Sequence, residues 1–86
     1  MSYGVEFLDD SGDELAALTS EITKRILKKI KWLANNGDSL SHEPLRANFA
    51  GLFKLRVGDY RVIYSLDLEE KTITIRKVGH RSNIYK

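Results

Sequence analysis

The sequence has 86 residues, of which 42% are hydrophobic and 30% charged, and it contains no cysteine. This length fits one domain over residues 1–86, and the lack of cysteine excludes a disulfide framework and thiolate chemistry. No apolar run approaches the roughly 18–20 residues of a membrane span, and the first residues lack the basic and apolar regions of a signal peptide. We therefore expect a soluble, cytosolic protein.

Charge is distributed unevenly along the chain, although the net charge is only +2. Residues 1–20 hold five acids and no base, whereas residues 21–86 hold 14 bases and seven acids. A basic body of this kind favours a polyanionic partner, without indicating which one.

The N-terminal part predicts one strand and two helices. Residues 3–8 alternate loosely, as a short strand does. The stretch DDSGDELAAL favours a helix, because Ser11 and Glu14 match a capping box. Thr19 or Ser20 is the expected cap of a second helix, and Asn35-Asn36-Gly37 is its expected stop.

The second helix is predicted to be amphipathic. Its apolar face, with Leu27 at the edge, consists of Ile22, Ile26, Ile30, Leu33 and Ala34. Its remaining surface carries Lys24, Arg25, Lys28, Lys29 and Lys31, which are either solvated or in contact with RNA phosphates. Trp32 is expected at the edge of the core or on a partner surface. Residues 37–44 are predicted as a loop with His42 on its surface, and residues 45–50 are ambiguous.

From residue 52 the hydrophobic period changes to two, which predicts strands at 52–57, 60–67 and 72–78. Gly58-Asp59 joins the first two as a two-residue hairpin, and LEEK joins the second to the third. The tail after residue 79 is too short to assign. The order predicts an α+β fold, in which two N-terminal helices pack on one face of a small, mostly antiparallel four-stranded sheet.

The hairpin sorts side chains between two faces of this sheet. One face, expected to cover the helices, carries Phe53, Leu55, Val57, Tyr60, Val62, Tyr64 and Leu66. The other carries Lys54, Arg56, Arg61 and Ile63, with Arg56 directly opposite Arg61. Like charges in this position destabilise a strand pair. A solvated face explains any single cation, but the set favours an anion site, because arginine binds phosphate by paired, charge-assisted hydrogen bonds.

Cleavage of RNA would need more than a phosphate site. The 2′-hydroxyl must lose its proton, the charge on a pentacoordinate phosphorus must be stabilised, and the leaving 5′-oxygen must gain a proton. Arginine and lysine can supply the electrostatic part, and a histidine or tyrosine can supply the proton transfers. The sequence offers His80 as its one suitable imidazole, with Tyr64 and Tyr85 as phenols.

The segments GLFKLRVGDYRVIYSL and VGHRSNIYK resemble the RelE/ParE superfamily of bacterial and archaeal toxins, and the resemblance covers nearly the whole chain. It is closer to the RelE branch, which implies a toxin of a type II toxin–antitoxin system that cuts messenger RNA in the ribosomal A site. Attack by the 2′-hydroxyl, without a metal or another cofactor, would leave a 2′,3′-cyclic phosphate and a 5′-hydroxyl.

The resemblance also implies roles for single residues. Lys54 matches a catalytic lysine at the scissile phosphate, and Arg61 matches an arginine that contacts the phosphate and the transition state. Arg81 matches an arginine that supports the leaving oxygen, and Tyr85 matches a tyrosine that stacks on or activates the nucleotide. His80 stands where some members carry lysine and could act as general acid or base.

The sequence departs from the family pattern at two places and offers two further cations as candidate site residues. Some members carry a lysine where this chain has Leu52, and Arg56 could compensate from the same face. Arg56 and Lys77 are therefore candidate substrate-binding residues. The chain extends only one residue beyond Tyr85.

The resemblance further implies a cognate antitoxin protein and the ribosome with its messenger as partners, and no membrane. Two alternatives stay open: a ParE-like inhibitor of DNA gyrase without nuclease activity, and a non-catalytic basic domain that binds nucleic acid.

Overall fold

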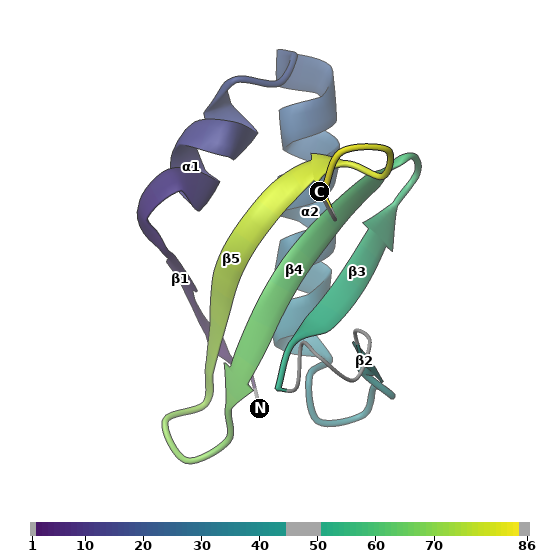
Figure 1. Ribbon diagram of the computed structural model, residues 1–86. Coiled ribbons are helices and arrows are strands. Elements are labelled where there is room, and N and C mark those ends of the chain that lie inside the picture. The colour runs from purple at the N-terminus through teal and green to yellow at the C-terminus, as the bar shows by residue number, and fades with distance from the viewer. Residues whose placement is uncertain (1, 45–50, 85–86) are drawn as a thin grey trace.

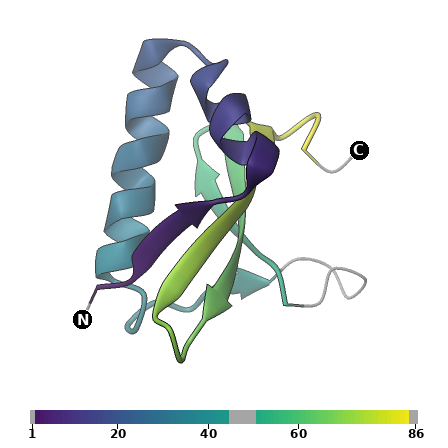
Figure 2. The ribbon, with the colours of Figure 1, turned by 90° about the vertical axis from the view of Figure 1, so that its left-hand side faces the viewer.

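Five strands form one sheet in the computed structural model, which describes residues 2–44 and 51–84. The elements in chain order are β1 (Gly4–Phe7), α1 (Asp9–Ala16), α2 (Ser20–Asn35), β2 (Glu43–Pro44), β3 (Phe53–Val57), β4 (Tyr60–Asp67) and β5 (Thr72–His80). The strand order across the sheet is β1-β5-β4-β3-β2. Only the β1–β5 pair is parallel. Both helices lie on one side of the sheet (Figures 1 and 2). The α+β class and the placement of the helices are thus confirmed.

Strand β2 is the element that the sequence did not predict. Its two residues lie in the stretch expected to be a loop, and they pair with β3 through Glu43–Lys54 and Pro44–Phe53. A strand this short shows no alternation, and a proline is tolerated there because β2 lies at the sheet edge. The segment 45–50, which the sequence left ambiguous, lies outside the described residues.

Helix α1 begins earlier than predicted. Ser11 was expected to cap it, but the helix begins at Asp9 after Leu8, and Ser11 lies inside it. Its side chain is fully buried and its hydroxyl contacts the carbonyls of Leu8 and Ile75. Ser11 therefore ties α1 to β5. The second predicted cap is confirmed, since the Thr19 side chain accepts from the N–H of Ile22 at 3.4 Å.

The core lies between the helices and the sheet. The predicted α2 face is confirmed, because Ile26, Ile30, Leu33 and Ala34 are buried. The predicted sheet face is confirmed as well, with Leu55, Val57, Val62 and Tyr64 buried and Phe53, Tyr60 and Leu66 packed against them. Leu27 is exposed at the helix edge. Within the described residues, neither helix is long and apolar enough to cross a membrane.

His42 is not the surface residue that the sequence suggested, because it is half-buried and bridges two segments. Its Nε2 faces the carbonyl of Gly37 at 2.8 Å, and its Nδ1 faces the hydroxyl of Tyr64 at 2.7 Å. A carbonyl can only accept, so Nε2 carries the hydrogen and Nδ1 accepts from the tyrosine. Burial, followed by the charge of Glu43, raises the pKa of Tyr64 to about 12.

The raised pKa of Tyr64 gives the first prediction. Its neutral phenol contributes stability that is fully present below pH 10 and lost as the pH rises to about 12. A shift of this size corresponds to up to about 2–3 kcal/mol. We expect Tyr64→Phe to cost about 1 kcal/mol at neutral pH, through the lost hydrogen bond. In urea titrations, its deficit relative to the parent chain should shrink between these pH values; a constant deficit would contradict the assignment.

A second prediction concerns Gly37, which is buried against the ring of Tyr3. A Cβ at position 37 would lie 2.5 Å from Cε1 of Tyr3, and that ring is itself buried. Gly37→Ala should therefore cost about 1–3 kcal/mol of unfolding free energy. Gly12→Ala in α1 is the matched control, since its Cβ would meet nothing closer than 4.0 Å and alanine favours a helix. Equal stability of the two variants by thermal unfolding would refute this packing argument.

Candidate functional site

The open face is the side of the sheet opposite the helices, and its candidate residues are Lys54, Arg56, Arg61, Ile63 and Lys77. The strand register arranges them in two rows across β3, β4 and β5. Lys54, Ile63 and Lys77 form one row, and Arg56, Arg61 and Gly79 form the next. The predicted Arg56–Arg61 opposition is therefore present. Four cations, two of them guanidiniums, converge from three strands.

The two opposed arginines have different partners. Nη2 of Arg56 lies 3.1 Å from Oε1 of Glu43, whereas Nη1 of Arg61 donates to the carbonyls of Gly58 and Tyr60, both at 2.9 Å. One guanidinium is thus turned toward the sheet edge and the other toward the hairpin tip. This separation reduces the repulsion that their register would otherwise impose.

Glu43 is a residue of this face that the sequence analysis missed. Its Oε1 lies 3.5 Å from Nζ of Lys54 as well as 3.1 Å from Arg56. A carboxylate between two cations occupies the kind of place that a phosphate oxygen would take. The only early signal was its acidic side chain beside a proline, and its partners lie 11 and 13 residues further along the chain.

Arg81 joins Arg61 at the tip of the β3–β4 hairpin. Its backbone N–H donates to the carbonyl of Asp59 at 2.8 Å, and its Nε lies 3.8 Å from Oδ1 of the same residue. The Arg81 side chain is 62% exposed, so it is free to turn toward a ligand. Residues 58–60 therefore bring together two of the predicted site residues that are 20 positions apart in the sequence.

His80 lies on the other face of the sheet. It pairs with Tyr60 across β4 and β5, and their rings meet edge to face at 5.4 Å. The N–H of Ser82 donates to its Nδ1 at 3.2 Å. Its neutral tautomer in this arrangement carries the hydrogen on Nε2. The structure thus places His80 at the end of the sheet and not within the rows of Lys54 and Arg61.

The segment after β5 folds back over the open face. Two N–H groups, of Asn83 and Ile84, donate to the carbonyl of His80. Ile84 is buried, and a Cβ at Gly79 would lie only 3.2 Å from its Cδ1. Ile63, predicted on this face, is only 4% exposed. The end of the described chain lies on the side away from the helices (Figure 2). Tyr85 lies outside the described residues.

This arrangement fits an anionic ligand. Guanidinium and ammonium groups on neighbouring strands can contact several oxygens of one phosphate or of consecutive phosphates. The exposed arginine at the hairpin tip extends the positive surface beyond the sheet. Among residues 2–44 and 51–84, no group of three or more His, Cys, Asp or Glu side chains could hold a metal ion.

Known proteins are similar to this chain in both sequence and fold. Residues 5–85 match the family described as the ParE toxin of the type II toxin–antitoxin system, parDE. The chain is 46% identical to Toxin RelG of Mycobacterium tuberculosis over 86 residues, which cover 100% of this chain and 99% of that protein. It is 39% identical to Toxin RelE of the same organism over 54 residues, covering 63% and 55%.

Solved structures agree with the sequence matches. The toxin–antitoxin complex RelBE2 from M. tuberculosis contains a chain with a TM-score of 0.83 and 30% identity, covering 94% of this chain and 100% of that one. The archaeal RelE–RelB complex from Pyrococcus horikoshii gives a TM-score of 0.73 at 26% identity, covering 96% and 99%. The resemblance noted in the sequence is thereby confirmed. The chain belongs to the RelE/ParE family of toxins of type II toxin–antitoxin systems.

Proposed function

We propose that this protein is a ribosome-dependent endoribonuclease that cuts messenger RNA in the ribosomal A site and so inhibits translation. The observation that carries the proposal is the pair of rows on the open face, where Lys54, Arg56, Arg61 and Lys77 meet with Arg81 close to Arg61. Cations gathered from separate strands suit a site that stabilises charge on a phosphorus centre. Action on the ribosome implies a cytoplasmic location.

In the proposed reaction the 2′-oxygen attacks the adjacent phosphorus and the bond from phosphorus to the 5′-oxygen breaks. The 2′-hydroxyl gives up a proton and the 5′-oxygen gains one, which leaves a 2′,3′-cyclic phosphate and a 5′-hydroxyl. Negative charge on the phosphoryl oxygens is greatest in the transition state. Lys54 and Arg61 would stabilise that charge, and Arg81 would support the leaving oxygen.

The proton transfers fall to His80 and Tyr85 in this proposal. Nδ1 of His80 accepts a hydrogen bond from the Ser82 N–H, so the neutral imidazole has its hydrogen on Nε2 and can donate it there. Because His80 lies at the end of the sheet on the Tyr60 face, this donor would reach the leaving oxygen from that end, next to Arg81. Tyr85 would stack on the nucleotide or activate it. Arg56 and Lys77 would bind neighbouring phosphates of the substrate, with no metal involved.

The proposal includes a cognate antitoxin as a partner. Complexes of the related chains with RelB antitoxins have been solved from M. tuberculosis and P. horikoshii. An antitoxin that covers the open face would block access of RNA to its cations. The ribosome with a messenger in its A site would be the second partner.

A ParE-like inhibitor of DNA gyrase is the second candidate function. It is favoured by the family match, which carries the ParE name over residues 5–85. The position matching a lysine in some RelE-type members is Leu52, which removes one cation from a catalytic set. A non-catalytic domain that binds nucleic acid is the remaining alternative, and it needs only the positive surface.

Loss of Arg61 provides the direct test. Brief induction of the parent chain should produce cuts at fixed positions within translated codons of a reporter messenger, detected by primer extension. Arg61→Ala should reduce cutting by about 10²–10³-fold, as expected when one group that stabilises the transition state is removed. Blocking translation should abolish the cuts.

Arg76→Ala is the matched control, because Arg76 is an exposed arginine of β5 whose Nε contacts Ser65 Oγ at 3.1 Å. It should cut like the parent. Arg61→Lys keeps the positive charge but loses the guanidinium. Thermal unfolding of this variant shows whether a loss of cutting comes from the chemistry or from the lost contacts to the hairpin carbonyls. Intact messengers with growth arrest and DNA damage would instead support gyrase inhibition. Intact messengers with normal growth would support the non-catalytic domain that binds nucleic acid.

Glu43 gives a further prediction. If its carboxylate holds Lys54 and Arg56 where phosphates bind, Glu43→Gln should tighten binding of an RNA oligomer that is 2′-O-methylated and therefore cannot be cut. An exposed ion pair contributes up to about 1 kcal/mol, which corresponds to roughly fivefold in affinity. Glu69→Gln makes the same change in net charge within the β4–β5 turn. Equal tightening of both variants in fluorescence anisotropy would mean that only net charge matters.

A further inference from the structure

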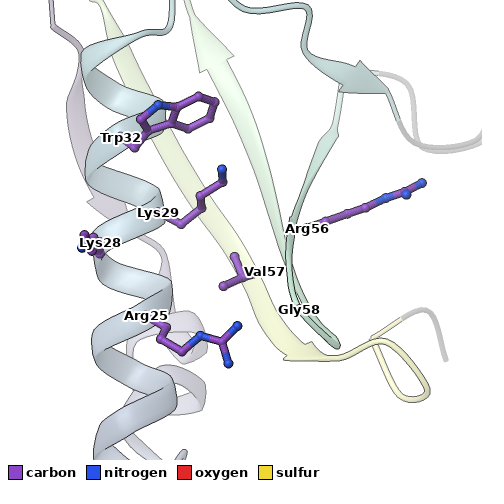
Figure 3. Close-up of a pocket in the computed structure, with 7 residues that line it drawn as sticks. All are labelled: Arg25, Lys28, Lys29, Trp32, Arg56, Val57 and Gly58. Atoms are coloured by element: carbon purple, nitrogen blue, oxygen red, sulfur yellow. The ribbon is translucent and has the colours of Figure 1, made fainter.

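A groove runs between α2 and strand β3, on the helix side of the sheet. We call it the α2–β3 groove, and it is lined by Arg25, Lys28, Lys29, Trp32, Arg56, Val57 and Gly58. Its volume is about 450 Å³. Arg25, Lys29 and Trp32 project from successive turns of α2 toward β3 (Figure 3). A pocket of this size accommodates a segment of a polymer rather than a single ion.

Four of the seven lining residues are cations, and the lining contains no acid. Within the described parts of the chain, Arg25, Lys28 and Lys29 form no ion pair with an acid. The Arg25 guanidinium lies over Gly58, where a Cβ would come within 3.1 Å of its Nη2. Lys29 lies over the ring of Trp32, with Nζ 3.9 Å from the ring centre. Arg25 and Lys29 are therefore held in place without being neutralised.

The groove is continuous with the open face. A second hollow of about 230 Å³ adjoins it, shares Lys29, Trp32 and Arg56, and reaches Lys54. Arg56 and Lys54 thus line the groove system and also belong to the cationic rows. A single extended anion could follow α2, cross the edge of β3 where it would displace the Glu43 carboxylate from Arg56 and Lys54, and arrive at Arg61.

We infer that the α2–β3 groove binds the phosphodiester backbone of an RNA strand that continues onto the open face. Arg25 and Trp32 are seven residues apart, so the α2 side of the groove spans about 10 Å along the helix, enough for more than one phosphate. The choice of RNA among polyanions rests on the proposed function. Val57 and Trp32 are the only uncharged side chains in the groove lining, which offers few anchors to an amphipathic protein helix.

Binding can be measured separately from cleavage. The probe is a fluorescein-labelled, 2′-O-methylated RNA of 12 nucleotides, so the result does not depend on whether the chain is a nuclease. Trp32 is the only tryptophan in the sequence, and its fluorescence reports occupation of the groove. Anisotropy and tryptophan quenching are followed from 0.1 to 1 M salt for the full chain and its variants.

Arg25→Ala/Lys28→Ala removes two groove cations, and Lys24→Ala/Lys31→Ala removes two exposed cations of α2 that do not line it. Each phosphate contact on a single strand contributes about 0.7 to the slope of log K against log salt. The groove pair should therefore lower the slope by about 1.4 and weaken binding at 0.1 M salt by about 25-fold, with loss of the tryptophan quench. The control pair should leave both nearly unchanged.

Equal losses in the two pairs would overturn the inference, because net charge alone would then explain binding. Arg25→Gln/Lys28→Gln repeats the groove change with other side chains, in case the alanine pair unfolds. Poly-glutamate serves as a second ligand, because an acidic peptide is the other polyanion that could bind here. Among the described residues, β2 pairs only with Phe53 and Lys54 of β3, so residues 55–57 have room for a peptide strand. A groove pair that loses poly-glutamate but keeps RNA would identify an acidic protein segment as the occupant and overturn the inference as well.

Discussion

The two-residue turn at Gly58-Asp59 sets the geometry on which the sheet depends. Gly58 takes a positive φ of 59°, which a tight hairpin of this length requires and which glycine adopts without strain. The turn places Val57 opposite Tyr60 and Arg56 opposite Arg61. A register one residue different would turn the core residues outward and bury the cations. The hairpin therefore separates an apolar face from a positive one.

Once this register is set, the charges on the open face must be balanced. In the free protein the balance comes from within the chain, through Glu43 beside Lys54 and Arg56 and through backbone carbonyls beside Arg61. Such partners are weak and exposed, and a phosphate can replace them at little cost. The same arrangement that keeps the sheet stable without a ligand thus leaves its cations available to one.

The proposed catalytic face and the α2–β3 groove are two parts of one positive surface that bends around the edge of β3. The cations of α2 reach the groove because the apolar stripe of that helix packs on the sheet and turns its basic side toward the edge. The short strand β2 covers only Phe53 and Lys54 of β3. None of the residues that the structure describes pairs with the remainder of that edge, which gives the surface its continuity.

Much of the molecule follows from local chemistry in the sequence. The alternation in β4, the stripe of α2, the Thr19 cap and the hairpin register depend on residues close to one another in the chain, and each was predicted. The family resemblance rests on the same segments, since these carry its motif. The cations of the open face can therefore be named from the pattern of residues alone.

Contacts between distant segments were decided only by the tertiary structure. His42 bonds to Tyr64, Ser11 bonds to Ile75, and Glu43 meets Lys54 across two strands. The position of His80 on the Tyr60 face likewise follows from pairing across β4 and β5. No periodicity marks such partners, because each contact depends on how the sheet twists and which segments cross it. The sequence by itself determined which residues alternate and where the chain turns; the packed sheet decided which of them meet, because only packing brings side chains remote in sequence within bonding distance.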